Sequence, residues 1–335
     1  MLQFFQSNDL SALTSLFCER SQVVDTDPFT ARTVIVQSHG TGQWLKLQLA
    51  ETQGISANLD CKLPADYIWS LYRDLLGQAK QSPMDKELLT WRVMSILPEQ
   101  RDPEFDSIRR YLDVPGDRDL RTFQLANEIA GLFDQYLVYR PEWLLAWESN
   151  NTLITSSAHP WQMRLWLSLL QVYPELRDQH RARLHLSLLK QLEALARPDR
   201  LPGHISLFGL SSLPQMHLDT FRALSAHLDV DIYFMNPCCH YWGDIVSAKD
   251  KAKRSIRNLI GKSGQLEDED YLEVGNPLLA AMGKQGRDFL ELILESDEVN
   301  SFDAFIPTSV DTALGFMQND ILNLELGGQF GSTDK

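Results

Sequence analysis

The chain has 335 residues and a formal net charge of −14, with 44% hydrophobic and 23% charged residues. These values predict a globular protein long enough for two domains, and the acidic balance argues against a non-specific nucleic-acid binder. No apolar run approaches the roughly 18 residues that span a bilayer, and the N-terminus lacks the basic segment of a secretion signal. We therefore predict a cytoplasmic protein without a membrane partner.

The charge is unevenly distributed along the chain. Residues 201–335 hold 10 Lys and Arg against 20 Asp and Glu, whereas residues 1–200 hold 21 against 25. The first 200 residues are rich in arginine, whose planar guanidinium suits contacts with phosphates and bases. Solvated helix faces are the alternative explanation for most of these arginines. The four cysteines lack metal-ligand spacing, and disulfides are not expected in the cytosol.

The first 63 residues alternate between strand and helix patterns. Residues 2–6 form an apolar run, and Ser7-Asn8-Asp9 offers a cap for a following helix. A second strand is predicted at residues 33–36, followed by a helix from near Gly42, and a short third strand at residues 55–59. This βαβα order predicts a parallel sheet.

From Pro64 to about Arg200 the pattern is helical, and prolines mark the helix boundaries. The longer predicted helices cover residues 87–97, 120–138, 161–172 and 183–196. The strand and helix alternation then returns, with predicted strands at residues 204–208 and 230–234, a helix at 214–228 between them, and a helix that starts at Asn276-Pro277.

The predicted fold is an α/β protein with a superfamily 1 helicase-like parallel-sheet core. Residues 1–63 and 201–326 make the core, and residues 64–200 form an all-helical insertion. Residues 261–270 are polar and acidic, which predicts a mobile loop. Residues 327–335 resemble a linker, and a chain that stops in a linker suggests a fragment of something longer.

One turn resembles a phosphate-binding P-loop that has lost its chemistry. Residues 37–44 lie between a strand and a helix, but of the G-x-x-x-x-G-K-[ST] pattern they keep only Gly42. Gln43 replaces the lysine that reaches the phosphates, and Trp44 replaces the hydroxyl that holds Mg²⁺. We therefore expect no nucleotide cofactor and a degenerate P-loop; an ordinary strand-to-helix turn is the alternative.

The remaining candidates are polar and aromatic residues at the ends of predicted elements. Glutamine pairs with adenine, arginine with guanine, aspartate accepts from cytosine, and tryptophan stacks on an unpaired base. Each has a plainer reading, such as a core tryptophan, a helix-terminal arginine or a hydrogen-bonding loop histidine. The candidates are Gln37, His39, Gln43, Trp69, Asp134 and Arg140. We find no nucleophile elbow, metalloprotease helix or metal cluster, so we predict a binding or scaffold role without catalytic residues.

Several segments resemble the RecC family, the gamma subunit of bacterial exodeoxyribonuclease V. The resemblance runs from about Leu2 to Leu324. It rests on residues 35–38, 43–45, 63–65, 68–69, 132–141, 241–245 and 275–280, of which Leu132-Phe133-Asp134-Gln135-Tyr136-Leu137-Val138-Tyr139-Arg140-Pro141 is the most specific.

The resemblance implies a decayed superfamily 1 helicase that joins RecB and RecD in a heterotrimer. Such a subunit scaffolds the complex, helps to split the duplex, and scans the 3′-ended strand for the Chi sequence. It implies forked and single-stranded DNA as partners, a role in recombinational repair, and no ATPase activity of its own.

The Chi-reading cluster of the family carries over onto ten positions. Two of them depart from the family pattern, because His39 stands where the best-known members have threonine and Gly131 where they have aspartate. The recognised sequence is therefore expected to differ. The other eight are Gln37, Gln43, Leu63, Trp69, Leu132, Asp134, Arg140 and Arg181. An active P-loop ATPase fragment and a pure assembly scaffold are the rival interpretations.

Overall fold

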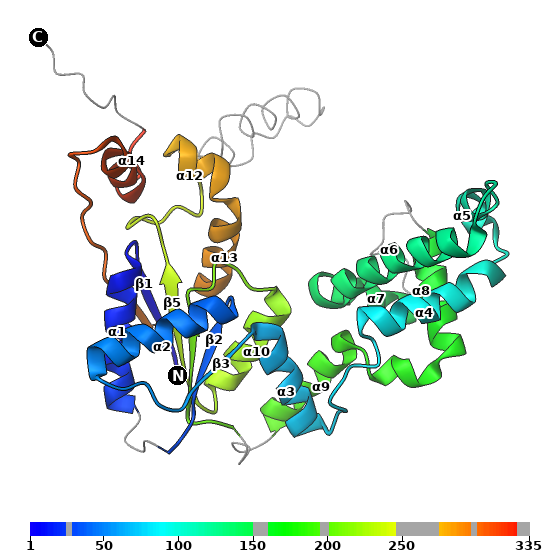
Figure 1. Ribbon diagram of the computed structural model, residues 1–335, viewed down its shortest axis with the longest axis horizontal. Coiled ribbons are helices and arrows are strands. Elements are labelled where there is room, and N and C mark those ends of the chain that lie inside the picture. The colour runs from blue at the N-terminus through cyan, green and yellow to red at the C-terminus, as the bar shows by residue number, and fades with distance from the viewer. Residues whose placement is uncertain (25–28, 150–159, 195–200, 246–274, 296–299, 327–335) are drawn as a thin grey trace, which may run out of the picture. The chain divides into compact units, whose positions relative to one another are not determined.

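The structure is a computed structural model that describes residues 1–24, 29–149, 160–194, 201–245, 275–295 and 300–326. The chain divides into two compact units, each described separately below (Figure 1). The α/β unit comprises Met1–Tyr67, Leu201–Leu213 and Leu224–Lys335. The helical unit comprises Ile68–Arg200 and Pro214–Ala223. The interpretation of these units as a helicase-like core and its helical insertion stays a prediction. The predicted loop at 261–270 and linker at 327–335 lie outside the described residues.

The α/β unit is built on a six-stranded sheet in which every described pairing is parallel, as the βαβα order predicts. The strand order is β3-β2-β4-β5-β1-β6. The strands are β1 (Leu2–Ser7), β2 (Arg32–Val36), β3 (Leu59–Lys62), β4 (His204–Phe208), β5 (Asp229–Met235) and β6 (Asn300–Asp303). Because parallel sheets are normally buried on both faces, strands such as β4 and β5 consist mostly of apolar residues.

Helices cover both faces of this sheet. On one face, α1 (Leu10–Val24) and α2 (His39–Gln53) contribute Phe17 and Leu45 to a core that also contains Phe208 and Tyr233. On the other face, Phe289 of α13 (Lys284–Leu294) packs edge-on against Phe234, with ring centroids 5.6 Å apart. The remaining described helices of this unit are α12 (Pro277–Met282) and α14 (Ala313–Leu322), and Asn276 caps α12 as its sequence predicts.

Three details of the α/β unit differ from the sequence prediction. The third strand begins at Leu59 rather than residue 55, because Asn58 has a φ of 52° and interrupts the extended backbone. Helix α2 begins at His39 rather than near Gly42, because Ser38 caps it. Strand β6 was not predicted, since all four of its residues are exposed and it shows no apolar run.

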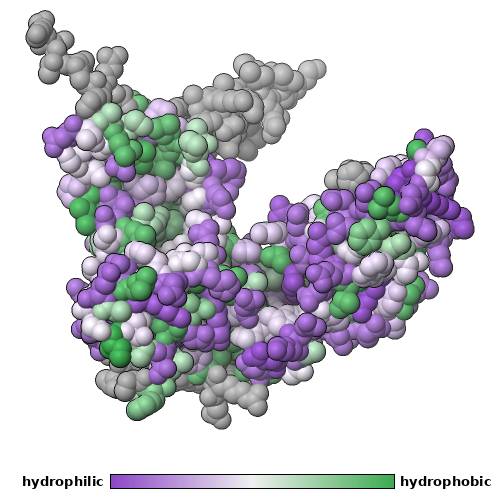
Figure 2. All heavy atoms as spheres, viewed as in Figure 1, coloured by the Kyte–Doolittle hydropathy of each residue, from purple (hydrophilic) through white to green (hydrophobic). Residues whose placement is uncertain are grey.

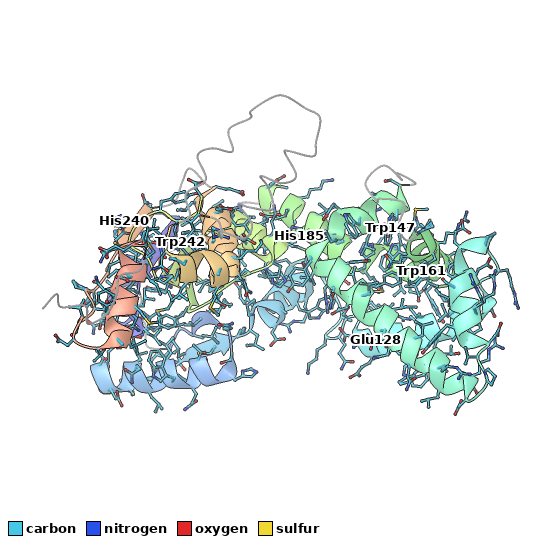
Figure 3. All side chains as sticks on the ribbon, turned by 90° about the horizontal axis from the view of Figure 1, so that it is seen from above. Glu128, Trp147, Trp161, His185, His240 and Trp242 are labelled. Atoms are coloured by element: carbon cyan, nitrogen blue, oxygen red, sulfur yellow. The ribbon has the colours of Figure 1, made fainter. Side chains whose placement is uncertain are left out.

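The helical unit has its own core around α6 (Arg118–Tyr139). Ala126 and Ala130 are fully buried on this helix, and Phe133 packs edge-on against Trp166. Trp147 is also buried in this core (Figure 3). The other helices of this unit include α3 (Pro64–Leu76), α4 (Lys86–Ile96), α5 (Asp106–Leu112), α7 (Pro141–Glu148), α8 (Pro160–Val172) and α9 (Arg181–Ala194). Short 3-10 turns cover Leu97–Glu99, Pro103–Phe105 and Pro174–Asp178, and α10 spans Gln215–Ser225.

A buried polar network joins three helices of this unit. The Glu148 side chain is fully buried at the end of α7 and accepts hydrogen bonds from Arg183 Nη2 at 2.8 Å and Trp166 Nε1 at 3.2 Å. His180 Nε2 lies 2.9 Å from the same carboxylate. Burial would raise the pKa of Glu148, but the adjacent His180, together with the hydrogen bonds from Arg183 and Trp166, lowers it below its usual value. The network therefore fixes a charged carboxylate directly beside the start of α9.

Candidate nucleic-acid interface

Four predicted site residues lie at the carboxyl edge of the sheet in the α/β unit. Gln37 follows β2, is exposed, and donates from Nε2 to Ser211 Oγ at 3.2 Å. His39 and Gln43 are exposed in the first turns of α2, and Leu63 is half-buried after β3. This edge is where open parallel sheets usually bind ligands. Here it presents amide, imidazole and hydroxyl groups that form hydrogen bonds without carrying fixed charge.

The turn between β2 and α2 contains only Gln37 and Ser38. Ser38 has an extended backbone and caps α2, because its Oγ accepts from the N–H of Thr41 at 3.1 Å. Gly42 lies within the helix and is buried, and a β-carbon there would come within 2.8 Å of the Cys61 Cβ. Close packing of α2 on β3 thus explains why a glycine occupies this position, and no bound phosphate is needed to account for it. The interpretation of this turn as a decayed P-loop stays a prediction.

In the helical unit, two predicted site residues contact each other directly. Arg181 Nη1 at the start of α9 donates to Asp134 Oδ1 on α6 at 2.6 Å. Asp85, just before α4, lies 3.9 Å from the same guanidinium. Burial raises the pKa of Asp85, and the nearby Arg181 opposes that rise. The Arg181 and Asp134 side chains keep 26% and 34% of their surface exposed, so the pair is accessible from solvent.

Gly131 and Leu132 lie one turn before Asp134 on α6. A β-carbon at Gly131 would lie 3.4 Å from Cε and 3.5 Å from Nζ of Lys86, the first residue of α4. An aspartate at this position, which the family resemblance leads us to expect, would therefore bring a carboxylate next to that ammonium. Leu132 is half-buried.

Arg140 and Trp69 complete the predicted set. Arg140 follows the last residue of α6, is exposed, and places its guanidinium 5.7 Å from the centre of the Trp143 ring. Trp69 on α3 is half-buried, donates from Nε1 to the carbonyl of Lys80 at 3.0 Å, and contacts Tyr72 edge-on. Trp69 is thus not a core residue, and the hydrogen bond from its indole N–H fixes the orientation of its ring.

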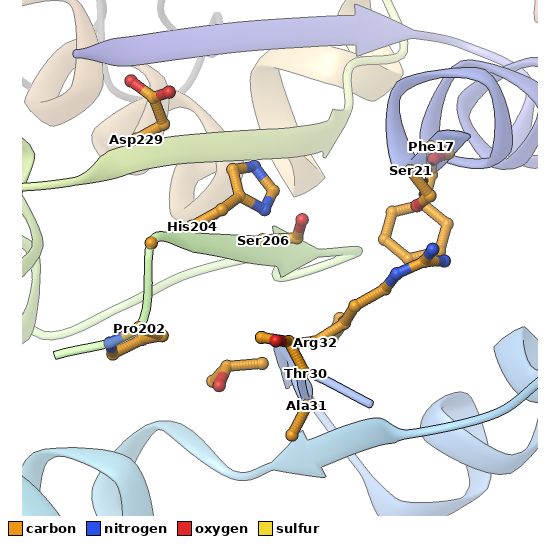
Figure 4. A pocket seen from close by; sticks show the side chains of 12 residues that line it. Phe17, Ser21, Thr30, Ala31, Arg32, Pro202, His204, Ser206 and Asp229 are labelled. Carbon is orange, nitrogen blue, oxygen red and sulfur yellow. Dashed lines mark hydrogen bonds between the residues drawn. The ribbon is translucent and has the colours of Figure 1, made fainter. Parts of the chain in front are cut away.

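The structure also contains a polar cluster that the sequence did not indicate. Asp231 is fully buried on β5, and its Oδ2 accepts from Arg20 Nε at 3.1 Å and lies 2.8 Å from His204 Nε2. A pocket of about 200 Å³ lies nearby, at the amino ends of the strands, and His204 and Ser206 are among the residues that line it (Figure 4). A lone aspartate within the apolar run of β5 was the available signal. The ion pair anchors α1 to the sheet.

The described ranges contain neither a candidate metal cluster nor a helix that could span a membrane. No group of three or more His, Cys, Asp and Glu side chains in these ranges is arranged to hold a metal ion. No helix there is both long and apolar enough to cross a bilayer.

Comparison with known proteins gives one consistent family. A family model described as "RecC, N-terminal domain" matches residues 2–324. The RecBCD enzyme subunit RecC of Escherichia coli is 36% identical over 97% of this chain and 31% of its own length. The corresponding Haemophilus influenzae subunit is 35% identical over 97% of this chain and 33% of its own.

A more distant relative is the RecC subunit of Mycolicibacterium smegmatis, which is 28% identical over 88% of this chain and 25% of its own length. The chain spans about a third of the length of the first two relatives. With the family model matching nearly every residue, the chain belongs to the RecC family and corresponds to its N-terminal domain.

Proposed function

We propose that this chain is part of the non-catalytic DNA-binding subunit of a RecBCD-type helicase-nuclease, a complex with RecB and RecD that acts in recombinational repair. In this role it contacts forked DNA, helps to split the duplex and scaffolds the complex. It also scans the 3′-ended single strand for Chi. The membership of the family and the exposure of the polar residues at the sheet edge and on the helical unit support this proposal.

The observation that carries the proposal is the solvent-accessible contact between Asp134 and Arg181. Both groups form strong directional hydrogen bonds with base edges, and their mutual pairing fixes the orientation of each. An aspartate and an arginine that were only solubilising the surface would gain little from so short a contact. The pair therefore presents an acceptor and a donor side by side to a strand passing over this face.

The rival interpretations make different demands on the chain. An active ATPase needs a phosphate-binding lysine and a metal-binding hydroxyl at the β2–α2 turn, and Gln43 and Trp44 occupy those positions. We expect no Mg²⁺-dependent ATP hydrolysis by the chain. Turnover that disappears when this turn is altered would favour the ATPase. A pure scaffold predicts that the exposed polar residues are interchangeable with other surface residues.

The experiment that separates these possibilities uses the full heterotrimer. Asp134→Ala and Arg181→Ala should each weaken the response to Chi while leaving duplex unwinding close to normal, because a lost base contact costs about 1–3 kcal/mol of discrimination. Glu142→Ala on the neighbouring helix α7, an exposed carboxylate, is the matched control. Equal loss of unwinding and Chi response would indicate a folding or assembly role and contradict the proposal.

A further inference from the structure

An aromatic pair on the helical unit is exposed to solvent. Trp91 of α4 and Phe123 of α6 keep 61% and 37% of their surface exposed. Their ring centroids are 5.4 Å apart and the rings are tilted by 44°. Hydrophilic residues cover most of the visible face of this unit (Figure 2). Two large aromatic rings in contact, yet open to water, mark a place where a flat apolar group could bind.

The pair lies on the same side of α6 as the proposed reading residues. Phe123, Asn127, Gly131 and Asp134 are spaced by four, four and three residues, so they form one ridge on the helix. Helix α4 runs antiparallel beside this ridge. Its first residue, Lys86, lies next to Gly131, whereas Trp91, further along α4, contacts Phe123, which is nearer the start of α6. The eleven helical steps from Phe123 to Asp134 extend about 16 Å, a length that a few nucleotides of single strand can follow.

The polar groups along this ridge suit a nucleotide. Among the described residues Lys86 has no ion pair, so its exposed ammonium is available to a phosphate between the two ends of the ridge. An open hollow of about 360 Å³ adjoins Phe123, and the amides of Gln124 and Asn127 line it. Glu128 also lines the hollow and disfavours a phosphate there. The expected arrangement places the base at the aromatic end and the phosphate toward Lys86.

The charge of the unit is compatible with this ligand. The helical unit contains 18 Lys and Arg against 19 Asp and Glu, a net charge of −1. The α/β unit contains 13 against 26, a net charge of −13. The acidic character that argues against DNA binding is therefore confined almost wholly to the α/β unit, and the ridge lies on the nearly neutral one.

We propose that Trp91 and Phe123 form a binding site for an unpaired base of single-stranded DNA, with Lys86 contacting the adjoining phosphate. The site extends the surface marked by Asp134 and Arg181 along α6, and it rests on the proposed function of the helical unit as a single-strand reader. Stacking on an aromatic ring tolerates any base, so this site grips the strand without selecting its sequence.

The test uses the full heterotrimer with forked DNA whose 3′-ended tail carries 5-iodouracil at successive positions. Irradiation should link one tail position to the peptide containing Trp91 or to that containing Phe123. Trp91→Leu keeps an apolar side chain but removes the aromatic face, and it should weaken tail binding between about 5-fold and about 150-fold. Trp91→Phe should keep most of the affinity. Tyr241→Leu, an exposed aromatic of the α/β unit, is the matched control and should change nothing.

Two outcomes would overturn the proposal. The first is the absence of any crosslink to these peptides at every tail position. The second is failure of Trp91→Glu to assemble with the partner subunits while Trp91→Leu assembles and binds the tail normally, which would identify a protein-docking face that also uses the exposed Leu88 and Leu120. Chi response is scored separately. If the Asp134 and Arg181 variants leave the Chi response intact while the crosslink persists, then that pair does not read bases. The stacking site would still stand in that case.

Discussion

At the residue scale, the helical unit places opposite charges so closely that each side chain constrains the next. Arg181 pairs with Asp134, and Lys86 lies at the position where a side chain on residue 131 would begin. Because glycine occupies that position, the Lys86 ammonium is not paired by residue 131. A base or phosphate that approaches this face meets one preformed ion pair and one available cation.

Gly131→Asp tests this arrangement directly. The new carboxylate should pair with Lys86, and because Lys86 is exposed and position 131 is only half-buried, the change in unfolding free energy should stay within about 1 kcal/mol. In the full complex, the added acceptor and the neutralised cation should change which Chi-like sequence gives the strongest response, and His39→Thr should add to that shift. The measurement is the Chi response to a panel of single-base variants of the site.

Gly131→Asn is the control for Gly131→Asp, because it adds similar bulk without charge. If the aspartate and asparagine variants both keep the original sequence preference, alone and with His39→Thr, then neither position reads bases.

At the element scale, α9 owes its placement to the buried carboxylate at the end of α7. His180 and Arg183 both contact Glu148, and Arg181 lies between them in the chain. The N–H of Arg183 also lies 3.4 Å from His180 Nδ1, so this imidazole contacts both the carboxylate and the first turn of α9. The contact of Arg181 with Asp134 thus depends on a network whose carboxylate is fully buried.

Glu148→Ala should destabilise the helical unit by about 3 kcal/mol. The substitution leaves His180 and Arg183 without their shared acceptor. The loss of unfolding free energy should lie at the lower end of the range for a broken buried ion pair, because the Arg183 side chain is partly exposed to solvent. Glu148→Gln keeps an acceptor and should lose less. Urea unfolding followed by tryptophan fluorescence measures both, since six of the eight tryptophans belong to this unit. Equal stability of the alanine variant and the parent chain would show that the network contributes nothing to the fold.

At the scale of the whole molecule, the helical unit should respond to mild acid. Burial lowers the pKa of His185 and of His217 to about 4 from the usual 6.5. Below pH 6.5 the unfolded chain binds protons that the folded unit excludes, so the stabilisation is complete above about pH 7 and declines as pH falls toward 4. Between pH 7.5 and 5 each histidine should account for a loss of about 2 kcal/mol.

The decisive measurement compares unfolding free energies at these two pH values for the parent chain and for His217→Leu, whose side chain cannot titrate. The variant should lose less stability on acidification, whatever its stability at pH 7.5. His240, which is exposed in the α/β unit, provides the control His240→Leu, and this variant should keep the slope of the parent. An unchanged slope in His217→Leu would mean that this histidine binds protons as readily in the folded state as in the unfolded state.

The sequence by itself determined the elements whose patterns are local. Apolar spacing and the prolines that end helices predict three such features. These are the alternation of strands and helices that gives a parallel sheet, the strand at His204–Phe208 and the long helix over Arg118–Tyr139. The family resemblance, confirmed by the comparisons, also depends on sequence alone. Strand β6 could not be predicted, because an exposed edge strand gains its stability from pairing with β1 rather than from its own pattern.

Only the tertiary structure decided which side chains meet. Asp134 and Arg181 are 47 positions apart, and only the packing of α9 beside α6 brings their charges into contact. Gly42 looked like the remnant of a phosphate loop, yet its packing against Cys61 gives it a steric reason that no local pattern contains. The proximity of Trp91 to Phe123 and of Lys86 to Gly131 likewise exists only because α4 runs antiparallel to α6. Sequence periodicity indicates which face of a helix is buried. Contacts between distant segments decide which element covers that face and which groups beside it stay exposed.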